Sequence, residues 1–233
     1  MVYLMVHLDT ETTGFSHTQH GVHSLGFVGE VVAETSEGVM SNVEYIGYWE
    51  FNPVGRERDA TALTVGHVTH EELDARVPAS EVGNEIRDAI DAMIEDCKNR
   101  YATIEVNMVG SYPQFDVRMI DGMDWEWKME RWFKDGENLV NTKDFIKDLE
   151  VRKVIEIPDH KLQTFVDTMG LRNTVIEENY KLSITTSIKC KGNANPFTVS
   201  KPHTAIYDCI CGMATMQKCM ELGACDAPVE TPV

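Results

Sequence analysis

The chain has 233 residues and a formal net charge of −17 at pH 7, with 38 acidic against 21 basic side chains. Its length suffices for one domain with a substantial core, and a hydrophobic content of 42% is ordinary for a folded protein. The charge argues against a broad basic nucleic-acid-binding face. No apolar run reaches the roughly 18 residues of a membrane-spanning helix, so no membrane association is expected.

The first fifty residues predict three antiparallel strands. An apolar run over residues 1–8 is followed by a β-rich segment from Val22 to Val32 and by an aromatic and β-branched one from Val43 to Phe51. The first run has no basic flank and no small-residue cleavage site. We therefore interpret it as a strand rather than a signal peptide and expect a cytoplasmic protein.

The middle of the chain predicts a helix between two strands. Ser80 is a predicted N-cap for a helix from Glu81 to Arg100, whose apolar residues recur at helical spacing. A strand from Thr103 to Val109 and a short helix from Phe115 to Gly122 follow. A helical crossover joins parallel strands, so we expect the strand at 103–109 to lie parallel to one of the first three.

The remaining segments are less regular. Residues 125–132 predict a tryptophan-rich helix or loop, which is expected near the mouth of any site. A strand and a short helix are predicted within 139–149, and a helix closed by Gly170 over 159–171. A loop or hairpin over 183–202 and a closing helix over 205–222 follow. The tryptophans are interpreted as packing residues. Residues 1–233 are expected to form a single domain, with region 125–200 as a candidate insertion.

Two carboxylates near the N-terminus suggest a metal site. Asp9 and Glu11 lie two residues apart at the end of the first predicted strand, and side chains on a strand alternate between its faces. Both carboxylates therefore point to the same side. Two like charges directed at one place are unfavourable unless a cation neutralises them, and hard oxygen ligands suit Mg²⁺ or Mn²⁺.

Further groups complete such a site. Asp116 lies where the helix after the strand at 103–109 begins, and His203 lies five residues before Asp208, a residue of the predicted closing helix. On a helix this spacing brings a ring and a carboxylate near one face. Four carboxylates and a histidine are what a two-metal phosphodiesterase needs, with the carboxylates holding the ions and the histidine deprotonating water.

The three segments resemble the motifs of the DEDDh 3′→5′ exonuclease superfamily, which includes the proofreading subunit of bacterial DNA polymerase, ribonuclease T and oligoribonuclease. The resemblance lies in Asp9-x-Glu11-Thr12-Thr13-Gly14, Phe115-Asp116 and His203-x-Ala205-x-x-Asp208, in that order. Residues 65–73 also resemble the family's "HGIT-x-E-x-L" segment, whereas little is recognisable between about 125 and 200. Pro113-Gln114-Phe115-Asp116 more closely resembles a small phage-type and bacterial branch with a Pro-x-Phe-Asp motif.

This resemblance implies a ribonuclease H-like α/β fold with a mixed central sheet flanked by helices. It implies a 3′→5′ exonuclease that releases nucleoside monophosphates from single-stranded DNA or RNA, with His203 as general base and two Mg²⁺ or Mn²⁺ ions held by Asp9, Glu11, Asp116 and Asp208. The residues implied to contact substrate are Thr12, Thr13, Gly14, Phe15 and Phe115. Several relatives are homodimers, and a phage protein would act in the bacterial cytoplasm.

Alternatives remain at this stage. The acidic surface favours a phosphodiesterase for short oligonucleotides, and the same fold could serve as a non-catalytic nucleic-acid-binding module. Other candidate sites are a zinc site at Cys209, Cys211, Cys219 and Cys225, a regulatory metal at His17, His20 and His23, and a substrate contact at Lys181, Lys189, Lys191 and Lys201. We interpret the cysteines as reduced thiols and the histidines as part of a solvated loop.

Overall fold

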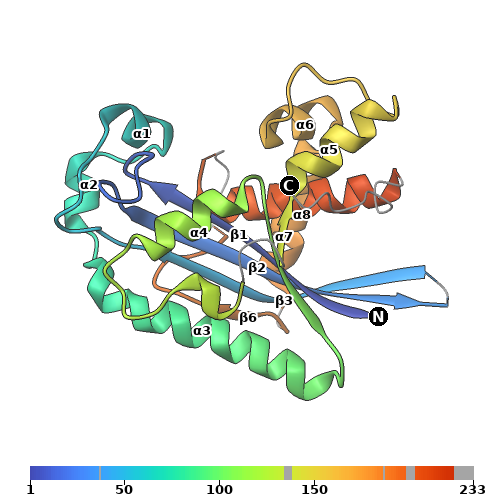
Figure 1. Ribbon diagram of the computed structural model, residues 1–233, viewed down its shortest axis with the longest axis horizontal. Helices are drawn as coiled ribbons and strands as arrows, with labels where there is room; N and C mark the ends of the chain where they lie inside the picture. Colours follow the sequence, from blue (N-terminus) through green and yellow to red (C-terminus); the bar gives the residue numbers. More distant parts are fainter. Residues whose placement is uncertain (37, 134–137, 186, 198–202, 223–233) are drawn as a thin grey trace.

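A six-stranded mixed sheet, in the order β5-β4-β1-β2-β3-β6, forms the centre of the computed structural model (Figure 1). The structure describes residues 1–36, 38–133, 138–185, 187–197 and 203–222. The strands are β1 (Val2–Thr12), β2 (Val22–Thr35), β3 (Gly38–Glu50), β4 (Glu105–Gly110), β5 (Leu139–Asn141) and β6 (Lys189–Lys191). The helices are α1 (Ala60–Val65), α2 (His70–Ala75), α3 (Ala79–Arg100), α4 (Pro113–Asp121), α5 (Thr142–Val151), α6 (Leu162–Thr168), α7 (Arg172–Ile184) and α8 (Ala205–Glu221), with a 3₁₀ turn, η1, at Met129–Arg131.

The predicted strand pairing is confirmed. β1, β2 and β3 form an antiparallel meander, and β4 lies parallel to β1 with Val109 opposite His7. β5 continues the parallel part beside β4, with Asn141 opposite Gly110. The carboxyl ends of β1, β4 and β5 therefore lie at one edge of the sheet, where open α/β sheets bind their ligands.

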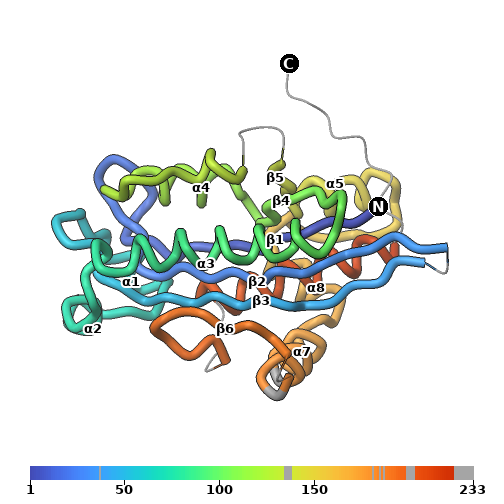
Figure 2. Tube along the Cα trace, turned by 90° about the horizontal axis from the view of Figure 1, so that it is seen from below, coloured from blue at the N-terminus to red at the C-terminus, as the bar shows by residue number. Residues whose placement is uncertain are grey.

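Helices cover both faces of the sheet, which confirms the predicted α/β fold class (Figure 2). Leu4, Val6 and Leu8 of β1 point to the face covered by α3 and α4, because alternate residues share a face. The opposite face packs against α8, with α5, α6 and α7 beside it. Asp9 and Glu11 have the parity of this second face, which places them on the side of α8.

The three tryptophans are packing residues. Trp125 stacks on Trp127 with 4.9 Å between ring centroids, and both indole nitrogens donate to carbonyl oxygens of α3, those of Ala79 and Gly83. Trp132 donates to Asp91 of the same helix. The tryptophans thus belong to the α3 layer, on the face of the sheet away from α8. The prediction that they are packing residues is confirmed.

Several predicted boundaries differ from the structure. Helix α3 begins at Ala79 with Pro78 in the cap position, so Ser80 lies inside the helix and is not its cap. Helices α1 and α7 were not predicted from the sequence. Residues 183 and 184, expected in a loop or hairpin, are the last two residues of α7. Helix α6 begins three residues after the predicted start at 159, although Gly170, at φ +66°, follows its end as predicted. No helix of the described residues is long and apolar enough to cross a membrane.

Candidate active site

The site begins at the end of β1. Asp9 lies opposite Gly26 of β2, and the register between the two strands shifts just beyond it, between Glu11 and Thr12. Such a bulge bends a strand and changes the direction of its side chains, and bulges are common beside active sites. The chain therefore turns away from the sheet immediately after presenting its second carboxylate.

Gly26 lets helix α8 approach the sheet at this point. A Cβ atom on Gly26 would lie 2.8 Å from the backbone nitrogen of Ile206 and 2.9 Å from the carbonyl carbon of Ala205, closer than any side chain tolerates. The thiol of Cys209 also donates to the carbonyl oxygen of Gly26 at 3.2 Å. The absence of a side chain at residue 26 thus brings the first turn of α8, which carries Asp208, onto the strand that lies beside Asp9.

Asp116 enters from α4 and is held by β1. Its Oδ1 atom accepts hydrogen bonds from both the backbone nitrogen and the hydroxyl of Thr10, at 3.1 and 2.7 Å, and both residues are buried. Thr10 lies between Asp9 and Glu11 in the strand, so its side chain leaves from the other face. These bonds fix the orientation of the carboxylate.

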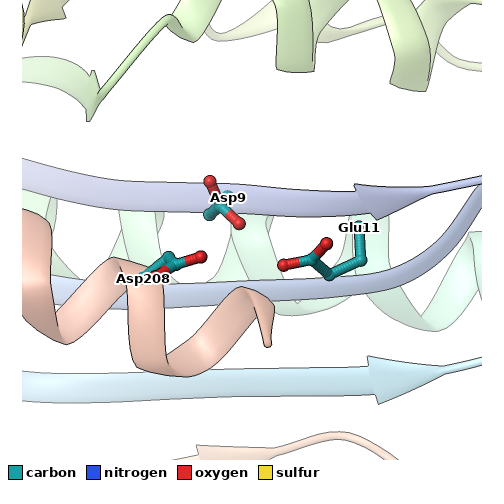
Figure 3. A group of neighbouring side chains, drawn as sticks. All are labelled: Asp9, Glu11 and Asp208. Atoms are coloured by element: carbon teal, nitrogen blue, oxygen red, sulfur yellow. The ribbon is translucent and has the colours of Figure 1, made fainter. Parts of the chain in front are cut away.

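The carboxylates of Asp9, Glu11 and Asp208 converge. One oxygen from each lies within 4.8 Å of the others, the spacing that a shared cation requires. Figure 3 shows the three side chains directed toward a common region between β1 and the first turn of α8. Asp116 lies outside this group of three but close enough for its charge to act on Asp9 and Glu11.

The electrostatics of the cluster are unfavourable without a cation. Burial, followed by repulsion from the other carboxylates, raises the pKa of Asp9 well above its ordinary value and that of Glu11 to about 8. Burial also raises the pKa of Asp116 and of Asp208 to about 7, although the hydrogen bonds from Thr10 and from the His203 backbone oppose this rise. Four hard oxygen donors that repel one another match a divalent-cation site, because a bound cation reverses the repulsion.

His203 lies beside this cluster but not on α8. The helix begins at Ala205, so the expectation that ring and carboxylate share one helical face is wrong. His203 is instead exposed in the left-handed region, with φ +63°, and its backbone bonds to the Asp208 carboxylate. Its ring lies 6.4 Å from that of His67, which also has a positive φ, +53°.

The residues expected to contact substrate separate into two groups. The Thr13 hydroxyl donates to the Glu57 carbonyl and accepts from the Gly21 nitrogen, so it holds the turn, and its full burial keeps it from contact with a ligand. Gly14 has no room for a side chain, because a Cβ atom would lie 2.3 Å from the His20 ring. Thr12 is half-buried and bonds to the Gly14 carbonyl.

The two phenylalanines, by contrast, form an aromatic pair at the surface. Phe15 is 82% exposed, and its ring centroid lies 6.3 Å from that of Phe115, one residue before Asp116. An exposed aromatic ring beside a cluster of carboxylates is unusual for packing and is a surface on which a nucleobase can stack.

The alternative metal sites do not form in the described part of the chain, where the three carboxylates are the one group of potential ligands. Cys209, Cys211 and Cys219 are buried along α8, and Cys225 lies outside the described residues. Burial raises the pKa of Cys209 and Cys211, which keeps them neutral thiols.

Four of the other candidate histidines and lysines, namely His20, His23, Lys181 and Lys189, have contacts away from a metal or a substrate. His20 packs against Gly14, and His23 is a buried residue of β2 whose pKa is lowered to about 3 by burial and by Arg76. Lys189 pairs with Asp96 of α3 and Lys181 with Glu178. Lys201 lies outside the described residues.

Comparison with known proteins identifies the fold. No protein-family model and no curated protein sequence matches the chain. Among solved structures, it is similar to E. coli exonuclease I in complex with a dA16 oligonucleotide, at a TM-score of 0.56 and 13% identity over 94% of this chain. The chain shares the fold of that nuclease. It spans only 40% of the length of exonuclease I.

Two further solved structures are similar to this chain. The zinc-bound form of an exonuclease I–single-stranded DNA complex matches 97% of this chain and 42% of that one, at a TM-score of 0.54 and 12% identity. Cell-death related nuclease 4 (CRN-4) matches 95% of this chain and 64% of its own, at a TM-score of 0.52 and 12% identity. At these identities the similarity establishes the fold and leaves the activity to the site itself.

Sequence reasoning missed two residues that build the site, Thr10 and Gly26. The alternation of side chains along β1 would have placed Thr10 on the face opposite Asp9, but nothing in the sequence indicates that α4 brings Asp116 to it. Gly26 stands within a run of β-forming residues, where a glycine marks a bulge or the close approach of another backbone.

Proposed function

We propose that the chain is a divalent-metal-dependent 3′→5′ exonuclease of the DEDDh superfamily that acts on single-stranded nucleic acid. The convergence of Asp9, Glu11 and Asp208 within 4.8 Å, with Asp116 beside them, carries this proposal. The 3′→5′ direction rests on the order of the three sequence motifs, and the fold shared with exonuclease I supports a nuclease.

The proposal assigns a role to each residue of the site. Asp9, Glu11, Asp116 and Asp208 would hold two Mg²⁺ or Mn²⁺ ions, and Thr10 keeps Asp116 in place through its two hydrogen bonds. When bound, such ions activate a water molecule and stabilise the leaving oxygen of an in-line displacement. His203, exposed at the entrance of α8, would accept the proton of that water. Phe15 and Phe115 would contact the terminal base.

Single-stranded DNA is the first substrate to test, because exonuclease I was solved with dA16 and dT13 oligonucleotides. The experiment uses matched DNA and RNA 12-mers carrying a 5′ or a 3′ label, incubated with Mg²⁺, Mn²⁺ or EDTA. We expect a ladder from the 5′-labelled strand and immediate release of a labelled mononucleotide from the 3′-labelled one, only with metal. Glu95→Gln, a change on the exposed side of α3, serves as the control variant, and Asp9→Asn should be inactive.

Two outcomes would contradict the proposal. Degradation from the 5′ end would show that the direction is wrong. Binding of the 12-mers by a folded sample without cleavage under either metal would favour the non-catalytic module. A rate that falls steeply beyond a few nucleotides would instead favour the short-oligonucleotide phosphodiesterase, which the net charge of −17 makes the second candidate.

A further inference from the structure

Two residues near the acidic cluster have no role in the proposed chemistry. Tyr112 lies two residues after the end of β4, and Lys143 lies two residues after the end of β5. These strands run parallel to β1 in the order β5-β4-β1, so their carboxyl ends lie beside the end that carries Asp9 and Glu11. Neighbouring strands are about 4.8 Å apart. Tyr112 and Lys143 therefore lie progressively farther from the carboxylates along the same edge of the sheet.

Tyr112 continues the exposed aromatic surface of the site. Its side chain is 51% exposed, and it directly precedes α4, whose first turn carries Phe115 and Asp116. Phe115 in turn contacts the exposed Phe15. Three aromatic residues thus lie in or beside the segment that begins α4. A large ring left in contact with water beside a site is a stacking surface for a base.

Lys143 supplies a positive charge at the same place. Its Nζ atom lies 5.6 Å from the centroid of the Tyr112 ring, within range of a cation–π contact. Its sequence neighbour Asp144 pairs with Lys147 instead, at 3.5 Å. Among the described residues no carboxylate forms an ion pair with Lys143. Many basic residues of this acidic chain are paired, for example Arg76 with Glu50 and Lys189 with Asp96. An unpaired lysine at this edge of the sheet is therefore a cation that an anionic ligand can bind.

We propose that Tyr112 and Lys143 bind the single strand on the 5′ side of the scissile phosphate, with a base stacked on Tyr112 and a backbone phosphate paired with Lys143. This inference rests on the proposed function, because it takes the carboxylates as the location of the scissile phosphate. It deepens that function by assigning the substrate: a polymer that extends beyond the terminal nucleotide, guided across the ends of β4 and β5. One charge at this position overcomes the repulsion of an acidic protein only locally.

The test compares a substrate without upstream nucleotides with a series that has them. Thymidine 5′-monophosphate p-nitrophenyl ester offers only the terminal nucleotide, whereas single-stranded DNA of two to twelve nucleotides offers progressively more. Stacking on an aromatic side chain changes affinity by about 5- to 150-fold per base. Tyr112→Ala should therefore lower kcat/KM for the longer oligonucleotides by about this factor and leave the ester unaffected, and Tyr112→Phe should restore the rate.

Lys143 has a matched control on its own helix. Lys143→Ala should weaken binding of the 12-mer and reduce the slope of log affinity against log salt by about 0.7, the contribution of one phosphate of a single strand. Lys147→Ala removes a lysine one turn further along α5, paired with Asp144, and should change neither quantity. Lys143→Arg should retain most of the affinity. Binding is measured by fluorescence anisotropy of labelled dT12 with Ca²⁺ in place of Mg²⁺.

The outcomes separate this inference from the proposed function. If Tyr112→Ala lowers the rates on the ester and on the oligonucleotides equally, the inference is overturned while the exonuclease stands. If neither substrate is hydrolysed by the unmodified chain, the proposed function fails and the anisotropy measurement decides. Equal affinity of Tyr112→Ala and the unmodified chain for dT12 then overturns the inference, and weaker binding by the variant supports it.

Discussion

Replacing Asp208 by asparagine should stabilise the metal-free protein. The substitution removes one of four mutually repelling charges but keeps an oxygen that can accept the hydrogen bond from the His203 backbone. Burial raises the pKa of Asp208 from its ordinary 3.8 to about 7. One pKa unit corresponds to about 1.4 kcal/mol. The free-energy cost of keeping Asp208 ionised in the folded protein would therefore be about 4 kcal/mol. Because the side chain is partly exposed, solvent screening reduces this cost to about 2 kcal/mol.

The sign of the pH dependence follows from the direction of the shift. A carboxyl group whose pKa is higher in the folded state binds more protons when folded, so stability falls as pH rises from about 4 to about 7. In EDTA the higher stability of Asp208→Asn over the unmodified chain should be absent at pH 4 and fully present at pH 8. For a protein of this size, about 2 kcal/mol corresponds to about 4–8 °C in Tm.

The assay is thermal unfolding followed by circular dichroism in EDTA at pH 5, 7 and 8, with Glu95→Gln as the exposed control. Mg²⁺ should raise the Tm of the unmodified chain more than that of Asp208→Asn, because the cation relieves repulsion that the variant has already lost. The reasoning is refuted if Asp208→Asn is no more stable than the unmodified chain at pH 8, or if its advantage does not change with pH.

Three other changes test the construction of the site and of the sheet. Gly26→Ala should displace the start of α8 and lower nuclease activity by tenfold or more, whereas Gly212→Ala, on α8 with nothing within 4 Å of its Cβ position, should unfold at the same temperature or higher. Thr10→Val should weaken Mn²⁺ binding by about 10–100-fold, measured by titration calorimetry, with Thr10→Ser near normal; equal affinities would exclude the positioning role. Glu30→Ala leaves buried His7 without its hydrogen-bond partner at 3.0 Å and should cost about 1–3 kcal/mol in urea unfolding, more than Glu30→Gln. Burial raises the pKa of Glu30, but hydrogen bonds from His7, Gln217 and Ser41 together lower it by more, so the net pKa lies below 4.5. The stability that Glu30 contributes should therefore be present above pH 4.5 and lost as the pH falls below it.

The sequence predicted those parts of the fold that depend on local patterning. A continuous apolar run and segments rich in β-branched and aromatic residues identified β1, β2 and β3, and α3 and α8 were predicted to within a few residues. The alternation of side chains along a strand placed Asp9 and Glu11 on one face, as the structure has them. Predictions were less accurate after residue 122, where the apolar pattern is weak. Helix α7, for example, was missed because it lacks a clear apolar face.

The parts of the site that were not predicted depend on contacts between distant segments. Thr10 bonds to Asp116, 106 residues away, and no local signal shows which strand residue a helix will reach. The closing helix begins at Ala205 as predicted, but the spacing argument that put His203 and Asp208 on one helical face does not hold, because the chain enters α8 through His203 in a left-handed conformation. Tyr112 and Lys143 meet only because β5 pairs with β4, a pairing three residues long.

The most direct test is the binding of Mn²⁺ to the carboxylates of Asp9, Glu11, Asp116 and Asp208, since the proposed function depends on it. Mn²⁺ is titrated into EDTA-treated, desalted protein and the free ion is followed by electron paramagnetic resonance, for the unmodified chain, Asp9→Asn and Glu95→Gln. The account predicts bound Mn²⁺ in the unmodified chain and Glu95→Gln, and a loss of at least tenfold in affinity for Asp9→Asn. Equal binding by all three, or no binding by the unmodified chain, would contradict it.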